Sequence, residues 1–141
     1  MYRLLKRDVL RSDMKDTELK FWTTKPNVFL VAKMDGKVVG CGSYKHMNPD
    51  TVEMCRLCVD ANHRGLRIGR KLVEALNITA KNEGYNCMYL QTSNAQIDAQ
   101  KMYEKMGFSL LRKIGFEGSV LVAFLVDNFS GLHARAYIQR L

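Results

Sequence analysis

The chain has 141 residues, of which 47% are hydrophobic and 26% charged, and it contains two prolines. This length predicts one domain, and the composition supplies a core while excluding an intrinsically disordered chain. The formal net charge of +8 favours a negatively charged partner, such as a nucleotide, an acidic lipid surface or an acidic substrate. The apolar runs are too short to cross a bilayer, and no signal peptide is visible.

The N-terminal part of the chain predicts a short lead-in, a helix and a hairpin. Met1–Lys6 is basic, and we expect residues 1–11 to be flexible or to lead into the first helix. Asp16–Thr23 follows capping residues and predicts that helix. Val28–Lys33 and Val38–Lys45 predict two paired strands, because an Asp-Gly dipeptide between such runs favours a tight turn. A loop is expected at Met47–Asp50.

The central segment predicts a strand, a basic turn and a helix. Thr51–Val59 is rich in strand formers, and apolar residues from Ile68 to Ala80 recur at helical spacing until Gly84 ends the helix. Four cations lie in the turn, where the helix N-terminus is already partially positive. Residues Arg64–Lys71 are therefore either a phosphate cradle of backbone N–H groups and glycines, or a solvated basic helix start.

The remaining residues predict a strand, a helix and further strands. Ser93–Gln96 reads as a capping box that opens the helix, and Gly107 ends it. The strands are expected at Asn86–Gln91, Phe108–Ile114 and His133–Leu141, with Val120–Val126 as a strand or a short helix.

The four cysteines, Cys41, Cys55, Cys58 and Cys87, are interpreted as small buried side chains. Cys55 and Cys58 form a C-x-x-C pattern, but strand alternation would point residues three apart to opposite faces. We therefore expect no metal site, and free thiols suit a reducing compartment.

Two segments resemble the cofactor motifs of the GNAT N-acetyltransferase superfamily. Arg64-x-x-Arg67-x-Gly69, preceded by Leu57-Cys58-Val59-Asp60, is similar to the acetyl-CoA pyrophosphate loop Q/R-x-x-G-x-G/A, with Arg67 in place of the middle glycine. Gln96-x-x-Ala99-x-x-Met102-Tyr103 and the following Gly107-Phe108 resemble the second cofactor segment, which ends in Tyr-x-x-x-Gly-Phe. Within the superfamily, the chain from about Asp8 to Leu141 is most similar to the camello-like membrane N-acetyltransferases.

This resemblance implies an α/β fold with a mixed, mostly antiparallel sheet that is splayed at its centre and flanked by helices. The superfamily's first strand and helix are not recognisable, so we expect them to be missing from a single domain at residues 1–141. Acetyl-CoA is the implied co-substrate, with no metal. The residues implied to bind it are Leu57, Cys58, Val59, Arg64, Gly65, Leu66, Arg67, Ile68, Gly69, Arg70, Lys71, Gln96, Ala99 and Tyr103.

The resemblance also implies two catalytic residues. Tyr103 is the candidate acid for the leaving thiolate, and a core aromatic residue is the alternative interpretation. Glu53 is the candidate base: on strand alternation it shares a face with Cys55 and Leu57, where burial would raise its pKa. A solvated strand carboxylate is the alternative, and His46 and His63 are weaker candidates.

Arg56 falls on the face opposite Glu53 and is either solvated or paired with an acidic group. We expect acetyl transfer from acetyl-CoA to a primary amine in a ternary complex, the amine being an amino-acid conjugate, such as a cysteine S-conjugate, or a protein lysine. The alternatives are a non-catalytic acyl-CoA-binding module and a basic nucleic-acid-binding domain, although no nucleic-acid motif is visible. The location is expected to be cytoplasmic, or the endoplasmic reticulum membrane if a longer parent carries the family's anchor.

Overall fold

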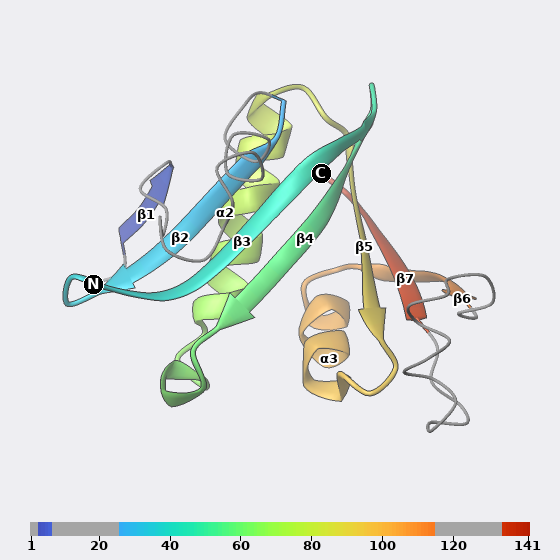
Figure 1. Ribbon diagram of the computed structural model, residues 1–141. Coiled ribbons are helices and arrows are strands. Elements are labelled where there is room, and N and C mark those ends of the chain that lie inside the picture. The colour runs from blue at the N-terminus through green and yellow to red at the C-terminus, as the bar shows by residue number, and fades with distance from the viewer. Residues whose placement is uncertain (1–2, 7–25, 115–133) are drawn as a thin grey trace, which may run out of the picture. The chain divides into compact units, whose positions relative to one another are not determined.

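The computed structural model describes residues 3–6, 26–114 and 134–141 (Figure 1). The chain divides into two compact units, which are described separately. The first unit comprises Met1–Met88 with Arg140–Leu141, and the second comprises Tyr89–Gln139. The strands and helices bear out the predicted mixed α/β class.

The first unit contains an antiparallel meander of four strands: β1 (Arg3–Lys6), β2 (Val28–Met34), β3 (Lys37–Asn48) and β4 (Thr51–Val59). The expectation that the first strand is missing was wrong, because β1 pairs with β2 from Arg3 opposite Lys33 to Lys6 opposite Leu30. Four residues are too few to show a hydrophobic alternation, so the sequence pattern gave no signal for β1. The helix expected at Asp16–Thr23 lies outside the described residues.

The β2–β3 hairpin is confirmed at the predicted turn. Asp35 and Gly36 have φ angles of 50° and 77°, and positive φ at both central positions is typical of the tight turn that matches strand twist. The loop expected at Met47–Asp50 is shorter than predicted, since β3 continues to Asn48 and β4 begins at Thr51.

A bulge interrupts the pairing of β3 with β4. Cys41 lies opposite Cys58 and Ser43 lies opposite Cys55, so the single residue Gly42 faces two residues, Arg56 and Leu57. Arg56 has a φ of 53°, in the left-handed region. A bulge adds one residue to one strand, so the side chains beyond it change faces relative to simple alternation.

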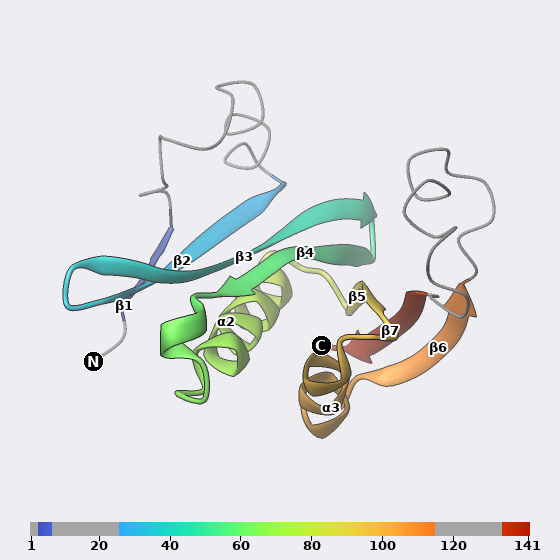
Figure 2. The same cartoon turned by 60° about the horizontal axis from the view of Figure 1, so that its bottom comes forward.

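Helix α2 (Ile68–Asn82) lies along one face of the β2–β4 sheet (Figures 1 and 2). It buries the apolar residues that the helical spacing had identified, namely Ile68, Leu72, Val73, Leu76 and Ala80. Gly84, with a φ of 92°, follows its C-terminal end as predicted. A Cβ atom on Gly40 would lie 3.2 Å from Leu72 Cδ1, and one on Gly42 would lie 3.1 Å from Leu76 Cδ1, so both glycines let the helix approach the sheet.

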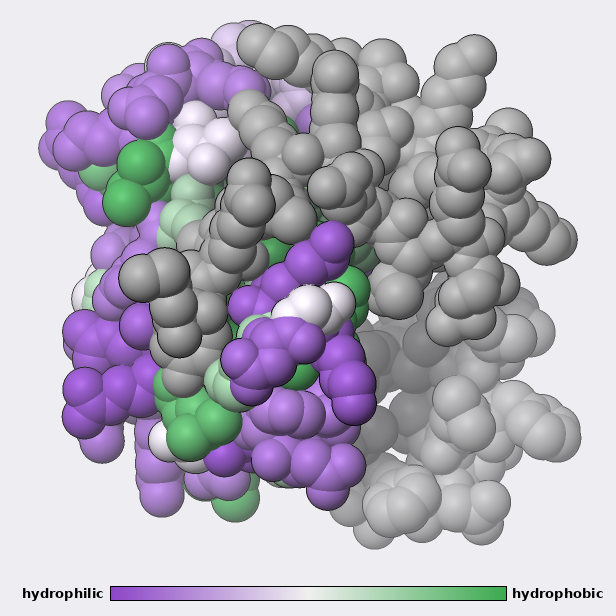
Figure 3. All heavy atoms as spheres, turned by 90° about the vertical axis from the view of Figure 1, so that its left-hand side faces the viewer, coloured by the Kyte–Doolittle hydropathy of each residue, from purple (hydrophilic) through white to green (hydrophobic). Residues whose placement is uncertain are grey.

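The opposite face of the same sheet carries a second apolar cluster. Phe29 and Val31 are buried there, with Val38, Cys41 and Cys55 packed against them. On the surface shown in Figure 3, the described residues present mainly hydrophilic side chains, and the hydrophobic ones form small separate patches. Buried apolar residues of this unit therefore lie on both faces of the sheet.

The second unit takes up most of β5 (Cys87–Ser93), together with α3 (Ile97–Lys105), β6 (Ser109–Ile114) and β7 (Ala134–Arg140). Strands β6 and β7 pair antiparallel, which confirms the predicted closing strand. The expected segment Val120–Val126 lies outside the described residues.

The predicted capping box at the start of α3 was wrong. Gln96 is the N-cap residue and makes no side-chain capping bond, because its Oε1 accepts a hydrogen bond from Thr92 Oγ1 at 2.6 Å. Ser93 Oγ instead accepts from the backbone N–H of Ala95 at 3.1 Å. Gly107, with a φ of 93°, follows the helix as predicted.

Candidate functional site

The turn between β4 and α2 begins with a polar cap. The backbone N–H of Asp60 donates to Val39 O at 2.9 Å, which joins the end of β4 to β3. The Asp60 carboxylate lies 2.7 Å from His63 Nδ1 and accepts from the N–H of Asn62 at 3.3 Å. The hydrogen bond from His63, and then that from Asn62, lower the pKa of Asp60. These contacts fix the short 3-10 turn η1 (Ala61–His63) that leads into the basic loop.

Two residues of the basic loop have left-handed backbone conformations. Gly65 has a φ of 78°, and Arg67 has a φ of 60° and a ψ of 19°. Arg67 therefore keeps the kind of backbone conformation that suits the motif glycine whose place it takes. An L-residue in this region costs roughly 1–2 kcal/mol, so the loop geometry is maintained against strain.

The start of α2 concentrates positive charge. Arg64, Arg67, Arg70 and Lys71 are all exposed, and the first turn of the helix contains no acidic residue. The first N–H groups of a helix have no partner within it, and they point toward the same end as the positive dipole. The charge of Arg70 is partly balanced by Glu74, because Arg70 Nε donates to Glu74 Oε1 at 2.9 Å. This segment is therefore suited to bind an anion such as a phosphate.

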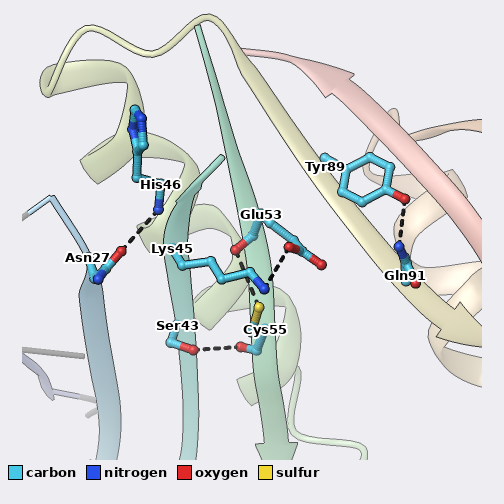
Figure 4. A network of polar contacts seen from close by, with 8 residues as sticks. All are labelled: Asn27, Ser43, Lys45, His46, Glu53, Cys55, Tyr89 and Gln91. Atoms are coloured by element: carbon cyan, nitrogen blue, oxygen red, sulfur yellow. Dashed lines mark hydrogen bonds and ion pairs between the residues drawn. The ribbon is translucent and has the colours of Figure 1, made fainter. Parts of the chain in front are cut away.

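Side chains of β3 hold the bulge of β4 from the opposite strand. Ser43 is fully buried, and its hydroxyl donates to the carbonyl oxygen of Cys55 at 2.9 Å (Figure 4). The thiol of Cys41 lies 3.5 Å from the carbonyl oxygen of Arg56, as a donor to it. Two consecutive carbonyl groups of β4 are thus held by β3, which leaves the following residues Leu57–Val59 in a defined position.

The bulge corrects two expectations based on strand alternation. Leu57 does not share the face of Glu53, because its Cδ1 lies 3.2 Å from the position of a Cβ on Gly42, beside Leu76 of α2. Cys58 pairs directly with Cys41, on the face that also carries Cys55, so the two cysteines of the C-x-x-C pattern share a face. Alternation failed here because the extra residue of the bulge shifts the pattern by one.

Glu53 forms an ion pair across the two strands. Lys45 is its direct neighbour on β3, and Lys45 Nζ lies 3.0 Å from Glu53 Oε2 (Figure 4). The hydrogen bond to Glu53 raises the pKa of Lys45. Lys45 was not among the predicted site residues, although Lys45 and Glu53 stand at similar distances from the turn that joins β3 to β4. Glu53 is half-buried, so its carboxylate remains accessible for proton transfer directly or through water.

The two histidines considered as bases already have polar partners. His46 Nδ1 lies 2.9 Å from Tyr85 Oη, and His63 Nδ1 contacts Asp60. Across the described residues, no group of three or more His, Cys, Asp or Glu side chains could hold a metal ion. No helix in that part of the chain is both long and apolar enough to span a membrane.

The second unit holds the other predicted residues. Tyr103 is buried on α3, and its ring centroid lies 5.7 Å from that of Phe108 and 6.3 Å from that of Tyr137. Burial raises the pKa of Tyr103 to about 12. Gln96 and Ala99 lie at the N-cap and in the first turns of the same helix. Also in this unit, Gln91 Nε2 donates to Tyr89 Oη at 2.8 Å (Figure 4).

Residues 1–108 match the sequence profile described as the acetyltransferase (GNAT) family. The chain belongs to the GNAT acetyltransferase family. This GNAT chain is 37% identical over 105 residues to the Xenopus tropicalis protein named "Probable N-acetyltransferase camello", a match that covers 73% of the chain and 48% of that protein. It is 32% identical over 137 residues to human N-acetyltransferase 8B, covering 94% of the chain and 57% of that protein.

A third relative bears a different name. The N-acetylaspartate synthetase of Xenopus tropicalis is 36% identical over 100 residues, which cover 70% of this GNAT chain and 37% of that protein. The predicted similarity to camello-like proteins is confirmed by these matches. The chain spans about half the length of the first two relatives, with shares of 48% and 57%.

Solved GNAT structures resemble the chain over its whole length. An IAA acetyltransferase from Bacillus cereus has a TM-score of 0.79 at 18% identity, with complete coverage of both chains. A GNAT family acetyltransferase from Elizabethkingia anophelis, solved with acetyl-CoA bound, has a TM-score of 0.76 at 16% identity and covers 99% of this chain and 98% of its own. At these identities the likeness establishes the fold.

Proposed function

We propose that this chain is an N-acetyltransferase domain that binds acetyl-CoA and transfers its acetyl group to a primary amine. The observation that carries the proposal is the loop at the start of α2, where Arg67 keeps a left-handed backbone with a φ of 60° in place of the motif glycine. Family membership and the acetyl-CoA-bound GNAT structure support acetyl-CoA as the co-substrate.

In this proposal, the first turn of α2 binds the pyrophosphate of acetyl-CoA. Backbone N–H groups of Ile68, Gly69 and Arg70 supply donors, and Arg64 and Arg67 supply positive charge. We weight these two arginines above Arg70, because Arg70 already forms an ion pair with Glu74. The remaining predicted contacts, from Gly65, Leu66, Lys71, Gln96 and Ala99, stay part of the proposal.

Transfer of the acetyl group requires three further events. A backbone N–H at Leu57–Val59 polarises the thioester carbonyl. This role requires a backbone that is held in place, and the contacts at the neighbouring bulge support that. Glu53 accepts the proton that the attacking amine loses, directly or through water. Tyr103 donates a proton to the thiolate of CoA as the carbon–sulfur bond breaks.

The acceptor is proposed as an amino acid, an amino-acid conjugate or a protein lysine. One of the relatives is named for N-acetylaspartate, which supports an amino acid among the first acceptors to test. A panel should therefore contain aspartate, a cysteine S-conjugate and a lysine-containing peptide. The release of free CoA thiol with each amine reports turnover.

Two measurements test the proposal. Calorimetry should show that CoA binds much more tightly than pantetheine, which lacks the phosphates, and that this difference shrinks as salt screens the arginines. Equal affinities for CoA and pantetheine would exclude the phosphate cradle. Thiol release above the rate of spontaneous hydrolysis with at least one amine is expected.

A non-catalytic acyl-CoA-binding module is the second candidate, favoured by the side chain that Arg67 places where the motif has a glycine. It predicts tight CoA binding without thiol release for any amine in the panel. The variant Arg67→Gly separates the two candidates, because it restores the motif. Turnover that appears only in this variant would favour the binding module.

A further inference from the structure

Two thiols face each other beside the bulge of β4. Cys41 and Cys58 are direct partners in the antiparallel pairing of β3 with β4. Such partners have Cα atoms about 4.5–5.5 Å apart and side chains on one face of the sheet. Disulfides form when Cα atoms lie about 4.4–6.8 Å apart, so this pair is within reach of a cross-strand bond.

The two cysteines differ in access. Cys58 is exposed, whereas Cys41 is half-buried. Burial, and then the nearby Cys58 thiol, raise the pKa of Cys41. An exposed thiol reacts first with an oxidant in solution, and a neighbouring protected thiol then resolves the adduct.

The thiol of Cys41 also makes a hydrogen bond to the backbone of the bulge. It lies 3.5 Å from the carbonyl oxygen of Arg56, a residue whose φ is 53°. Oxidation removes the S–H proton, so this donor is lost whatever conformation the disulfide takes. The Ser43 hydroxyl on Cys55 O is a separate contact at the bulge, which the oxidation of Cys41 leaves in place.

We propose that Cys41 and Cys58 form a reversible disulfide across the β3–β4 bulge, and that this bond moves the bulge backbone and slows acetyl transfer. The effect on acetyl transfer rests on the proposed function, which assigns Leu57–Val59 to the acetyl group. The disulfide itself is independent of that assignment.

The oxidant is a small disulfide such as glutathione disulfide. The Cys58 thiol loses its proton and its thiolate attacks one sulfur atom of this oxidant, which forms a mixed disulfide and releases one glutathione thiolate that takes up that proton. The Cys41 thiolate then attacks the sulfur of Cys58, releasing the second glutathione, while the proton of Cys41 passes to a leaving thiolate. Two protein thiols are oxidised and one glutathione disulfide is reduced to two thiols.

The first test maps the bond without any substrate. The intact chain is treated with glutathione disulfide, its remaining thiols are alkylated, and its peptides are analysed by mass spectrometry. We expect a Cys41–Cys58 crosslink, two alkylated cysteines, and complete reversal by dithiothreitol. Four alkylated cysteines, a glutathione adduct that stays on Cys58, or a crosslink through Cys55 would overturn the proposal.

Matched variants then connect the bond to the bulge. Cys41→Ser keeps a hydroxyl donor for Arg56 O but cannot form the disulfide, whereas Cys87→Ser leaves the pair intact. Amide hydrogen exchange of residues 54–59 should become faster on oxidation of the parent and of Cys87→Ser, and stay constant in Cys41→Ser. An unchanged rate of amide exchange in the oxidised parent would refute the link between the disulfide and the bulge. This comparison uses the parent protein alone, so it does not depend on whether the variants fold.

Acetyl transfer gives the final readout. Oxidation should lower turnover of the parent on the order of 10²-fold, as for the loss of one carbonyl-polarising donor, and dithiothreitol should restore it. Turnover that is unaffected by a mapped disulfide would overturn the regulatory part. A fully reduced chain that acetylates no amine would instead refute the proposed function, while the crosslink and the exchange result would still stand.

Discussion

Arg67 contributes to the loop in two separate ways, through its backbone conformation and through the charge of its side chain. Its backbone has the left-handed conformation that favours glycine, with a φ of 60°. Its side chain is exposed and positively charged at the start of α2. A glycine there would remove strain, whereas an arginine adds a charge for an anion, so substitutions should separate folding stability from CoA affinity.

We therefore predict opposite effects of Arg67→Gly on stability and on binding. Glycine adopts the left-handed conformation without strain, which stabilises the folded state, but it also adds conformational entropy to the unfolded chain. The net effect should be a rise in the free energy of unfolding of up to about 1 kcal/mol. Loss of the guanidinium should weaken CoA binding. Arg67→Ala is the control, since it loses the charge but keeps the strain. Denaturant unfolding and calorimetry measure both, and equal stabilities of the two variants would contradict the strain.

The Tyr103 hydroxyl is predicted to contribute mainly to turnover and little to cofactor affinity. Tyr103→Phe should leave the affinity for acetyl-CoA nearly unchanged and lower kcat on the order of 10²-fold, because one proton donor is removed. With a pKa raised to about 12, the phenol stays protonated throughout the neutral range, so it should produce no limb in the kcat profile between about pH 6 and 9.

The control for this prediction is Tyr137→Phe in the same aromatic cluster. The Tyr137 hydroxyl donates to Glu104 Oε1 at 3.0 Å, so its removal should cost about 1 kcal/mol of stability without a comparable loss of kcat. Similar kcat values for parent and Tyr103→Phe would show that the Tyr103 ring only fills the core.

Glu53 is predicted to accept the proton of the attacking amine. Glu53→Gln keeps the shape of the side chain and removes the base, so kcat/KM should fall at every pH near neutrality. An acceptor with a lower amine pKa should rescue this variant more than the parent, because less of the amine is protonated. Lys45→Gln is the control, since it removes the ion pair and keeps the carboxylate. Matching rates for Glu53→Gln and parent across the pH profile would leave Glu53 without a role.

At the scale of single elements, the glycines of β3 determine how closely α2 and β4 approach that strand. A Cβ on Gly40 would lie 3.0 Å from the backbone oxygen of Cys58 and 3.2 Å from Leu72 Cδ1. The two tightest contacts of a Cβ on Gly42 would be with the ends of flexible side chains, Leu76 Cδ1 at 3.1 Å and Leu57 Cδ1 at 3.2 Å, and Leu72 Cβ lies farther away at 3.9 Å. Backbone atoms yield less easily than methyl groups.

Gly40→Ala should consequently destabilise the protein more than Gly42→Ala. We expect a loss of about 1–3 kcal/mol for Gly40→Ala, typical of overpacking, and a smaller loss for Gly42→Ala. Both variants have the same effect on the unfolded chain and both meet side-chain methyl groups at 3.1–3.3 Å, so the difference in stability reports mainly the contact with Cys58 O. Chemical denaturation measures it. A larger loss for Gly42→Ala would mean that the helix, and not the β4 backbone, is the rigid neighbour.

Most elements could be predicted from the sequence where a local signal was strong. The Asp35-Gly36 turn, the apolar face of α2 and the glycines after both helices all follow from local chemistry. The bulge could not be predicted, because it depends on how Gly42 pairs with two residues of the next strand. Because of that one extra residue, simple strand alternation assigned Leu57 and Cys58 to the wrong faces of the sheet.

Contacts formed between elements account for the rest of what was missed. The Lys45–Glu53 ion pair and the Cys41–Arg56 contact join residues of two different strands, so they require the register of the sheet. Strand β1 was missed because four residues show too little pattern. The roles of Tyr103 and Glu53 stay predictions, since they come from the resemblance and from chemistry.

At the scale of the whole molecule, charge and length limit which partners can be assigned. The formal net charge of +8 favours an anionic ligand, and part of that charge lies in the turn before α2. The chain spans 48% of the camello protein and 57% of N-acetyltransferase 8B, so the acceptors of those longer proteins remain proposals for this one. The acceptor panel addresses this directly.

The meander of the first unit has a consequence for the order of folding. Strands β2, β3 and β4 each pair with their neighbour in sequence, whereas pairing of β6 with β7 brings Ile114 opposite Ala134. Short connections carry a low loop-closure entropy, so the meander should form before the β6–β7 pair. In pulse-labelled hydrogen exchange during refolding, amides of β2–β4 should be protected first, and earlier protection of β6 and β7 would reverse this order. The segment that carries the bulge would then be in place while the C-terminal strands are still unpaired.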